Sequence, residues 1–424
     1  MKAIIKEYLM DLRLPYLRSL LLIALVPLFP EYISFVLVIG ALLFAIKDKK
    51  QSNTGWRLGI MGLGLLGYCI YMTFTCLLST QPLQSFLIAA MWWFFFIVFL
   101  LVKNLLTNCK RINAFLFFIT VVAGLVGIIT CIQYVVNVLV GSNTGSVWDF
   151  LDKPIFELVP FNLTIGLDYG TRAYSTFANP NMTAQYLVMV IPFTASFTFI
   201  QREKATRLFS AGCLIFACAG VVLTFSRGAY LALIVLALAL LILNIRKHYK
   251  AILIYGGIAL LLIPKQVYQR MTSFDGGERT EIWTESVIRF LDKPIFGYGV
   301  GTDTTAAIFE RIGIYAPHAH NLVLQLLLEG GVIALLIMLG IGFVAIKNGI
   351  SLIRVGNRAA FWLGFGVLGF VCTFCVHGLV DYALTVPRLI CVFVTLLGIA
   401  EQVPNMYIVR KPLTISTQTI QVNP

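Results

Sequence analysis

Long apolar runs separated by short polar segments make up most of this 424-residue chain. The runs are about 16 to 25 residues long, the length that a helix needs to cross a hydrocarbon core of roughly 30 Å. Backbone polar groups find no water in that core, so the runs should satisfy them internally as helices. We therefore expect an all-α polytopic membrane protein with about twelve transmembrane helices, near residues 14–30, 31–46, 57–78, 84–102, 112–140, 181–200, 208–225, 228–244, 250–264, 321–346, 358–382 and 386–402.

Composition supports this prediction and indicates an orientation. Only 12% of the residues are charged and the mean hydropathy is +0.89, whereas soluble proteins carry about 25% charged residues. The net charge of +13 is dispersed over short loops between helices, which argues against a nucleic-acid-binding surface. With the N-terminus in the cytoplasm, the inner segments hold about twice as many basic residues as the outer ones. We expect both termini to be cytoplasmic.

The predicted topology gives one integral membrane domain, 1–402, followed by a polar cytoplasmic tail, 403–424. Two long extracytoplasmic loops interrupt the helices, at about 141–180 and at about 265–320. The second loop is the larger one and connects the ninth and tenth helices. Long loops on one face of a rigid helical scaffold commonly carry function, so we expect the chemistry on this face.

The larger loop holds several residues suited to binding an anion and moving a proton. Apolar residues recur at helical spacing after Gly277, which predicts an amphipathic helix on the outer surface. Arg279 falls in its first turn, where the helix dipole favours an anion. A glycine-rich turn, 297–301, follows, and His318 and His320 come directly before the tenth helix.

Two further arginines reach the same predicted face: Arg172 precedes the sixth helix, and Arg227 lies in the turn between the seventh and eighth helices. Arginine forks match phosphate oxygens, and histidine titrates near neutral pH. The three arginines and two histidines together suit an enzyme that transfers a group from a phosphate-activated donor. Each residue also has a structural interpretation: a loop charge for Arg172, an interfacial side chain for Arg227, a helix-surface ion pair with Glu281 or Glu285 for Arg279, and helix capping for the histidines.

Three other polar positions look structural. Glu329 lies about 13 Å deeper than His320 along the tenth helix, so we expect a buried hydrogen-bonding role. His377 and Asp381 are four residues apart and share a helix face, which predicts a supporting pair with Arg388 close by.

Four segments in order resemble the O-antigen ligase and Wzy-type polysaccharide polymerase superfamily. They are Arg172 to Asn181, Thr224 to Leu231 (TFSRGAYL), Arg279 to Gly301 (RTEIW…GYGVG) and His320 to Gly331 (HNLVLQLLLEGG). They cover about the second half of the chain, and the number of predicted helices also agrees. Ala334 stands where the family usually has Gly, Thr or Tyr, which is a mild departure.

The resemblance implies a C-type membrane glycosyltransferase fold and an inverting, metal-independent reaction with no cofactor. The enzyme would move a glycan from undecaprenyl diphosphate to an acceptor hydroxyl at the outer face of the bacterial inner membrane, in cell-surface polysaccharide biosynthesis. The catalytic base would be His320, and Arg172, Arg227 and Arg279 would bind the donor diphosphate. Supporting roles are expected for His318, Asn321, Trp283, Gly299 and Gly301.

The acceptor stays open in the sequence. A ligase transfers to a glycan, lipid or protein acceptor, whereas a Wzy-type polymerase transfers to a second lipid-linked repeat unit. A non-enzymatic flippase or transporter of lipid-linked glycans is a third interpretation, but transporters line a midplane path with polar groups. Here the polar residues gather at one face. A cell-wall polymerase that assembles peptidoglycan lacks support from the segment that begins at His320.

Overall fold

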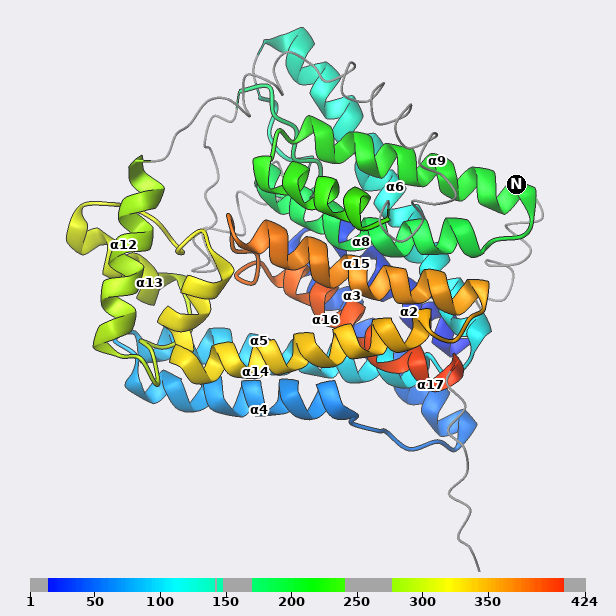
Figure 1. The fold of residues 1–424 in the computed structure, drawn as a ribbon, viewed down its shortest axis with the longest axis horizontal. Helices are drawn as coiled ribbons and strands as arrows, with labels where there is room; N and C mark the ends of the chain where they lie inside the picture. The colour runs from blue at the N-terminus through cyan, green and yellow to red at the C-terminus, as the bar shows by residue number, and fades with distance from the viewer. Residues whose placement is uncertain (1–13, 142, 148–169, 241–276, 408–424) are drawn as a thin grey trace, which may run out of the picture.

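The computed structural model describes residues 14–141, 143–147, 170–240 and 277–407, and all regular structure in these ranges is helical (Figure 1). The longer helices are α2 (Pro15–Leu25), α3 (Glu31–Ser52), α4 (Ile60–Thr75), α5 (Pro82–Leu105), α6 (Cys109–Val140), α8 (Pro180–Ile200), α9 (Lys204–Leu223), a helix over Arg227–Leu240, α12 (Gly277–Asp292), α14 (Leu322–Ile353), α15 (Arg358–Gly378) and α16 (Pro387–Gln402). Shorter elements are η1 (Val26–Leu28), η2 (Cys76–Leu78), α13 (Thr302–Phe309), η3 (Glu310–Ile312) and α17 (Pro404–Tyr407).

The protein is a multi-pass membrane protein. Within the described ranges, eight helices are long and apolar enough to cross a bilayer, and two shorter apolar helices cover Pro15–Leu28 and Arg227–Leu240. The predicted helix at 250–264 and most of the predicted tail lie outside the described residues. The total of twelve transmembrane helices therefore stays a prediction.

Asparagine and proline residues set many of the helix starts. Asn108, Asn179, Asn321 and Asn357 each cap a helix, because the side-chain oxygen of each accepts a hydrogen bond from a backbone N–H in the first turn. Helices α5, α8 and α16 begin with a proline, which needs no hydrogen-bond acceptor at that position. These local signals explain why the helix starts lie within a few residues of the prediction.

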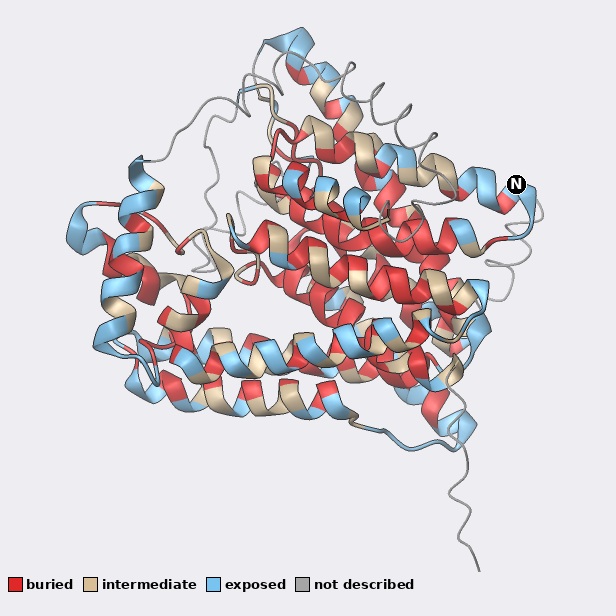
Figure 2. Ribbon diagram, in the orientation of Figure 1, coloured by how far each residue is buried: buried red, intermediate tan, exposed pale blue. Residues whose placement is uncertain are grey.

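Burial separates the central helices from the peripheral ones (Figure 2). In the most apolar 18-residue stretch of each helix, 89% of α8 and 28% of α9 is buried, and the figure for α16 together with α17 is 83%. Helix α9 therefore lies at the periphery of the bundle, whereas α8 and α16 form its centre. Both central helices begin at the end of the bundle where α12 and α13 lie (Figure 1).

A second, smaller hydrophobic core lies under α12 and α13, apart from the main one. Ile282 of α12 packs there with Phe309 of α13 and with Ala319, next to the predicted histidines. The larger predicted loop is thus a folded unit in its described part. This unit holds the segment that precedes α14 in a fixed position.

Helix α14 bends at a glycine pair. Gly330 and Gly331 have non-helical backbone angles, and the φ of Gly331 is +62°. The carbonyls before the bend bind the neighbouring loop: Tyr298 N–H donates to Leu328 O at 2.7 Å and Gly299 N–H donates to Glu329 O at 3.0 Å. A side chain at Gly331 would collide with the Ile295 carbonyl, 2.2 Å from an added Cβ. The bend therefore joins α14 to the glycine-rich turn.

The opposite end of the bundle carries structural charges. Arg111 pairs with Asp48 at 2.8 Å, and Lys103 Nζ donates to the Arg57 carbonyl at 2.8 Å. Glu401 accepts hydrogen bonds from the first N–H groups of α4, at Ile60 and Met61. These residues belong to the segments predicted to be cytoplasmic, and the contacts bring those segments together at one end.

Candidate functional site

All three predicted arginines line one cavity of about 280 Å³, which we call the basic cavity. The arginines come from three segments that are far apart in sequence. The basic cavity is lined by Arg172, Asn181, Phe225, Ser226, Arg227, Gly228, Leu231, Arg279, Thr280, Trp283, His377, Val380 and Asp381. Three guanidinium groups face one carboxylate there, so the cavity is suited to an anion.

Arg172 is held from two sides. Its Nε donates to the Thr224 carbonyl at 2.9 Å, and one terminal nitrogen donates to Asn181 Oδ1 at 2.9 Å. Its own carbonyl accepts a hydrogen bond from Asn143 at 2.8 Å. Arg172 therefore connects the segment before α8 to the turn that carries Arg227, two of the segments named in the sequence resemblance.

Arg227 is the first residue of the helix over Arg227–Leu240. The next residue, Gly228, permits a close approach, because an added Cβ would lie 2.4 Å from Val380 Cγ2 and 3.3 Å from His377 Cδ2. Ser226 Oγ also lies 3.4 Å from His377 Nε2. The turn after α15 thus packs directly against the start of this helix.

Arg279 lines the basic cavity and also a second cavity of about 480 Å³. We call the second one the carboxylate cavity, after its charged side chains Glu31, Glu278 and Glu329. The rest of its lining includes Ile88, Gly301, Tyr315, His318, His320 and Leu384. Arg279 sits at the boundary between the two cavities. Its expected structural partner Glu285 instead pairs with Arg289 at 2.6 Å.

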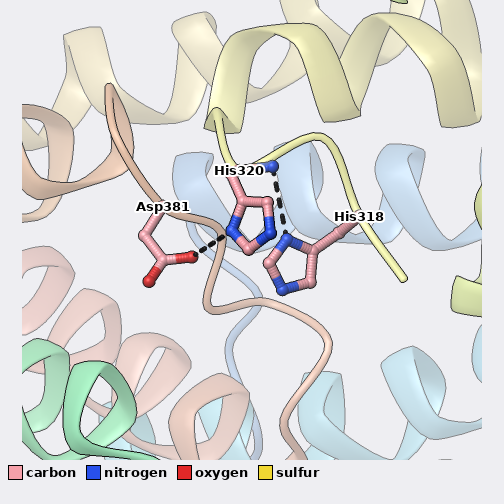
Figure 3. A group of neighbouring side chains, drawn as sticks. All are labelled: His318, His320 and Asp381. Atoms are coloured by element: carbon pink, nitrogen blue, oxygen red, sulfur yellow. Dashed lines mark hydrogen bonds and ion pairs between the residues drawn. The ribbon is translucent and has the colours of Figure 1, made fainter. Parts of the chain in front are cut away.

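His320 lies next to this boundary and contacts Asp381 (Figure 3). Its Nδ1 is 3.3 Å from Asp381 Oδ1. Asp381 was expected on the same helix face as His377, but α15 ends at Gly378, and the following turn brings Asp381 to His320. Asp381 lines the basic cavity and His320 lines the carboxylate cavity. The pair therefore joins the two.

The Asp381 carboxylate fixes the role of each imidazole nitrogen of His320. When Nδ1–H donates to Asp381, Nε2 keeps a lone pair that can accept a proton. Burial acts to raise the pKa of Asp381, but the hydrogen bond from His320 and the nearby histidines hold this pKa below its usual range. Asp381 is thus a carboxylate throughout the neutral range.

His318 completes a cluster with these two residues. His320 N–H donates to His318 Nδ1 at 3.3 Å, and the ring centroids of the two histidines are 4.2 Å apart. Burial, together with His320 and Arg279, lowers the pKa of His318 to about 3. Potential ligand atoms of His318, His320 and Asp381 lie within 4.8 Å of one another, the distance range of a metal site. In the structure, these groups satisfy one another with hydrogen bonds.

Backbone strain marks the site as well. Among the described residues, four other than glycine have positive φ, and two of them line the cavities: Phe225 and His320, with φ of 53° and 49°. Such conformations cost free energy and persist where the surrounding structure requires them. Phe225 lies two residues before Arg227, and His320 is the candidate base. A third such residue, Ser175 with φ of 54°, follows Arg172 by three residues.

The predicted supporting residues take different positions. Trp283 Nε1 donates to the Ala319 carbonyl at 3.0 Å, and Asn321 Nδ2 donates to the Leu379 carbonyl at 3.0 Å. Both contacts position the chain beside His320. Gly301 lines the carboxylate cavity. Gly299, with φ of +96°, packs against Ser79, which lies 2.5 Å from an added Cβ.

Arg388 lies elsewhere than expected. It pairs with Glu31 rather than standing beside His377 and Asp381, and it donates to the Thr176 carbonyl at 2.7 Å. Its guanidinium also stacks over Phe177, 4.5 Å from the ring centroid. Arg388 thereby anchors the strained segment that follows Arg172, and its contribution to the site is indirect.

The sequence analysis assigned too small a role to two carboxylates, those of Asp381 and Glu329. Asp381 was expected beside His377, and its contact with His320 could not be read from helical spacing. Glu329 has the buried hydrogen bonds that were expected, to Gln325 Nε2 at 2.9 Å and to Tyr382 Oη at 3.1 Å. It nevertheless lines the same cavity as His320, although we expected it far from the chemistry.

Comparison with known proteins gives one family match. No curated protein matches the chain. A family model described as O-antigen ligase matches residues 212–339, a segment that includes Arg227, Arg279, His320 and Glu329. Arg172 and Asp381, which also line the basic cavity, lie outside this segment. Over residues 212–339, the chain is therefore similar to the O-antigen ligase family.

Proposed function

We propose that this protein transfers a glycan from undecaprenyl diphosphate to an acceptor hydroxyl on the outer face of the cell membrane. The family match supports an enzyme of glycan ligation or polymerisation in polysaccharide biosynthesis. The observation that carries the finer proposal is the basic cavity, where Arg172, Arg227 and Arg279 meet next to the His320–Asp381 pair. We assign the ligase type, and the Wzy-type polymerase is the alternative.

The basic cavity supports the proposed binding of the donor diphosphate. A diphosphate carries its charge on several oxygens, and planar arginine forks bind such oxygens with paired hydrogen bonds. When the glycosyl bond breaks, further negative charge develops on the leaving oxygen, and fixed guanidinium groups stabilise it. The anchoring of Arg172 by Thr224 and Asn181 supports this role, because a fixed donor needs little rearrangement.

The proposed reaction is a single displacement. The acceptor hydroxyl oxygen attacks the anomeric carbon, and the bond from that carbon to the diphosphate oxygen breaks. The hydroxyl proton moves to His320 Nε2, and the electron pair leaves with the diphosphate. Asp381 holds the opposite nitrogen and stabilises the imidazolium that forms. Attack from the side opposite the leaving group inverts the anomeric configuration.

We propose that this reaction requires no metal ion and no cofactor. The three arginines supply the positive charge that a metal would supply to the leaving group. His320 has to keep Nε2 available for the acceptor proton, and a metal ion held by His318, His320 and Asp381 would compete for the same lone pairs.

We further propose that the protein resides in the bacterial inner membrane with both termini cytoplasmic. The basic residues around Asp48, Arg57 and Arg111 lie at one end of the bundle, and the two cavities lie at the other. The positive-inside rule assigns the basic end to the cytoplasm. A single domain over 1–402 with a cytoplasmic tail fits this arrangement.

The test is product analysis with the purified protein, a defined undecaprenyl-diphosphate glycan and candidate acceptor glycolipids, with a chelator present throughout. Transfer of the glycan to a different anchor indicates a ligase, and growth of the lipid-linked glycan indicates a polymerase. We expect release of undecaprenyl diphosphate together with an inverted linkage. Donor that stays intact with every acceptor, or movement of intact donor across a vesicle membrane, would refute the proposed transfer.

A further inference from the structure

The carboxylate cavity differs from the basic cavity in size and in charge. Its volume is about 480 Å³, compared with about 280 Å³ for the basic cavity. Three glutamates line it, of which Glu31 is paired with Arg388, and Arg279, at the boundary, is the one arginine among its lining residues. A diphosphate would face like charges there, whereas a neutral polyhydroxylated molecule would find hydrogen-bond acceptors.

Glu329 is the most enclosed of these glutamates. It is only 2% exposed, and both of its carboxylate oxygens accept a hydrogen bond from a neutral donor, Gln325 Nε2 or Tyr382 Oη. Among the salt bridges of the described residues, none includes Glu329. Each carboxylate oxygen has a second lone pair. A buried carboxylate within a membrane helix is costly, and such groups are usually functional.

The backbone around Glu329 is rigid. Glu329 is the last residue before the bend of α14, and its carbonyl accepts the hydrogen bond from Gly299 N–H at 3.0 Å. Gly297 is packed between the Leu328 carbonyl and the Gly330 nitrogen, which lie 2.5 Å and 2.7 Å from an added Cβ. The carboxylate is therefore held in place before any ligand arrives, as a recognition group should be.

A short network connects Glu329 to the candidate base. Tyr382 Oη donates to Glu329, and the backbone N–H of Tyr382 donates to Asp381 Oδ1 at 2.9 Å. Asp381 in turn contacts His320. Two adjacent residues, Asp381 and Tyr382, thus contact the base and the glutamate, and both His320 and Glu329 line one cavity.

We propose that the carboxylate cavity binds the acceptor saccharide, and that Glu329 accepts a hydrogen bond from an acceptor hydroxyl adjacent to the one that reacts. This proposal rests on the proposed function. The acceptor end that enters the cavity is uncharged, since phosphate or carboxylate groups would be repelled by Glu278. Tyr315, 66% exposed at this cavity, offers a ring face to the same saccharide. Glu329 is a binding and positioning residue, and His320 remains the base.

The experiment compares Glu329→Gln and Tyr315→Ala with the exposed control Glu310→Gln, which lies outside both cavities. Initial rates are measured at saturating donor against the concentration of the acceptor glycolipid that product analysis identifies. Binding of the undecaprenyl-diphosphate glycan is measured separately. We expect Glu329→Gln to raise the acceptor KM about fivefold to tenfold, because one oxygen that accepts hydrogen bonds is replaced by an amide nitrogen that cannot accept one. The donor Kd and the control variant should stay within twofold of the wild type.

Several outcomes would overturn the acceptor site. An unchanged acceptor KM in both Glu329→Gln and Tyr315→Ala contradicts it, and so does a loss of donor binding that equals the loss of acceptor binding. If Glu329→Gln fails to fold, Tyr315→Ala decides, because its side chain is exposed. A wild-type protein that neither binds nor consumes the donor refutes the proposed function. Normal transfer by the wild type with an unaffected KM in the variants refutes the acceptor site alone.

Discussion

The two cavities share a boundary but carry opposite charges. The basic cavity has three arginines and one aspartate, whereas the carboxylate cavity has three glutamates and Arg279. A glycosyl transfer needs an anionic leaving group and a neutral nucleophile in one site, and one uniform electrostatic field would favour only one of them. The separation of charge gives each reactant its own environment. The His320–Asp381 pair lies between them, where the proton has to move.

The two cavities are also built differently. The basic cavity depends on three chain segments that meet only in the folded protein, with Arg172 as the link. The carboxylate cavity depends on the bend of α14 and the turn before it. Changes in the basic cavity should therefore affect donor binding, changes in the carboxylate cavity should affect acceptor binding, and changes at the boundary should affect the chemical step.

The largest effect is expected for His320→Ala. Loss of the base should lower kcat about 10³-fold to 10⁴-fold, the upper range for general-base catalysis. The donor Kd should stay nearly unchanged, because the arginines remain. Single-turnover transfer and donor binding are measured on the same preparation. Full activity of a folded His320→Ala protein would exclude His320 as the base.

Asp381→Asn should lower kcat about 10²-fold, at the lower end of general-base effects, because the imidazolium loses its negative partner. Asp381 also lines the basic cavity, so loss of its charge should leave donor binding unchanged or slightly tighter. This opposite change in kcat and donor Kd would not follow from general damage to the fold. Asp292→Asn, on the exposed surface of α12, is the matched control. A parallel loss of donor binding in Asp381→Asn would contradict the assigned role.

Arg279→Lys should weaken donor binding about tenfold, since an ammonium group cannot reproduce a paired hydrogen bond to phosphate. The control is Arg289→Lys on the same helix, where the side chain pairs with Glu285 and lies outside both cavities. Donor Kd is measured for both variants, and only Arg279→Lys should change. Equal donor affinity in the two variants would remove Arg279 from the diphosphate site.

Much of the fold follows from local sequence signals. Apolar runs predict helices because lipid cannot hydrogen-bond to the backbone, and caps such as Asn108 and Asn357 set the ends. Two features did not follow. The predicted helix at 358–382 was too long, since α15 ends at Gly378. The bend at Gly330 and Gly331 depends on hydrogen bonds to a distant turn, which no local pattern contains.

The sequence predicted the position of those site residues whose place depends only on the order of the transmembrane helices. Alternating helices bring the segments of Arg172, Arg227 and Arg279 to one end, and the structure places all three in one cavity. Contacts of residues that follow the end of a helix could not be predicted from the sequence. Asp381 is the example, because it follows the end of α15 and contacts His320. Helical rise gave the depth of Glu329 along α14. It could not reveal that a cavity extends along that helix face to the same depth.

The smallest expected effect concerns the charge of His318, which lies beside His320 at the boundary between the two cavities. The pKa of His318 is lowered to about 3 in the folded protein, while an unfolded histidine has a pKa of about 6.5. The unfolded state therefore binds the extra proton first as the pH falls. The contribution of His318 to stability is complete above about pH 6.5 and declines below it, by at most about 1.4 kcal/mol per pH unit.

His318→Gln should make the free energy of unfolding in detergent less dependent on pH between 7.5 and 5.5. An identical pH dependence in the two proteins would mean that His318 accepts a proton where it stands. The boundary between the two cavities would then carry an additional positive charge at mildly acid pH, and the division of charge between donor and acceptor sites would depend on pH.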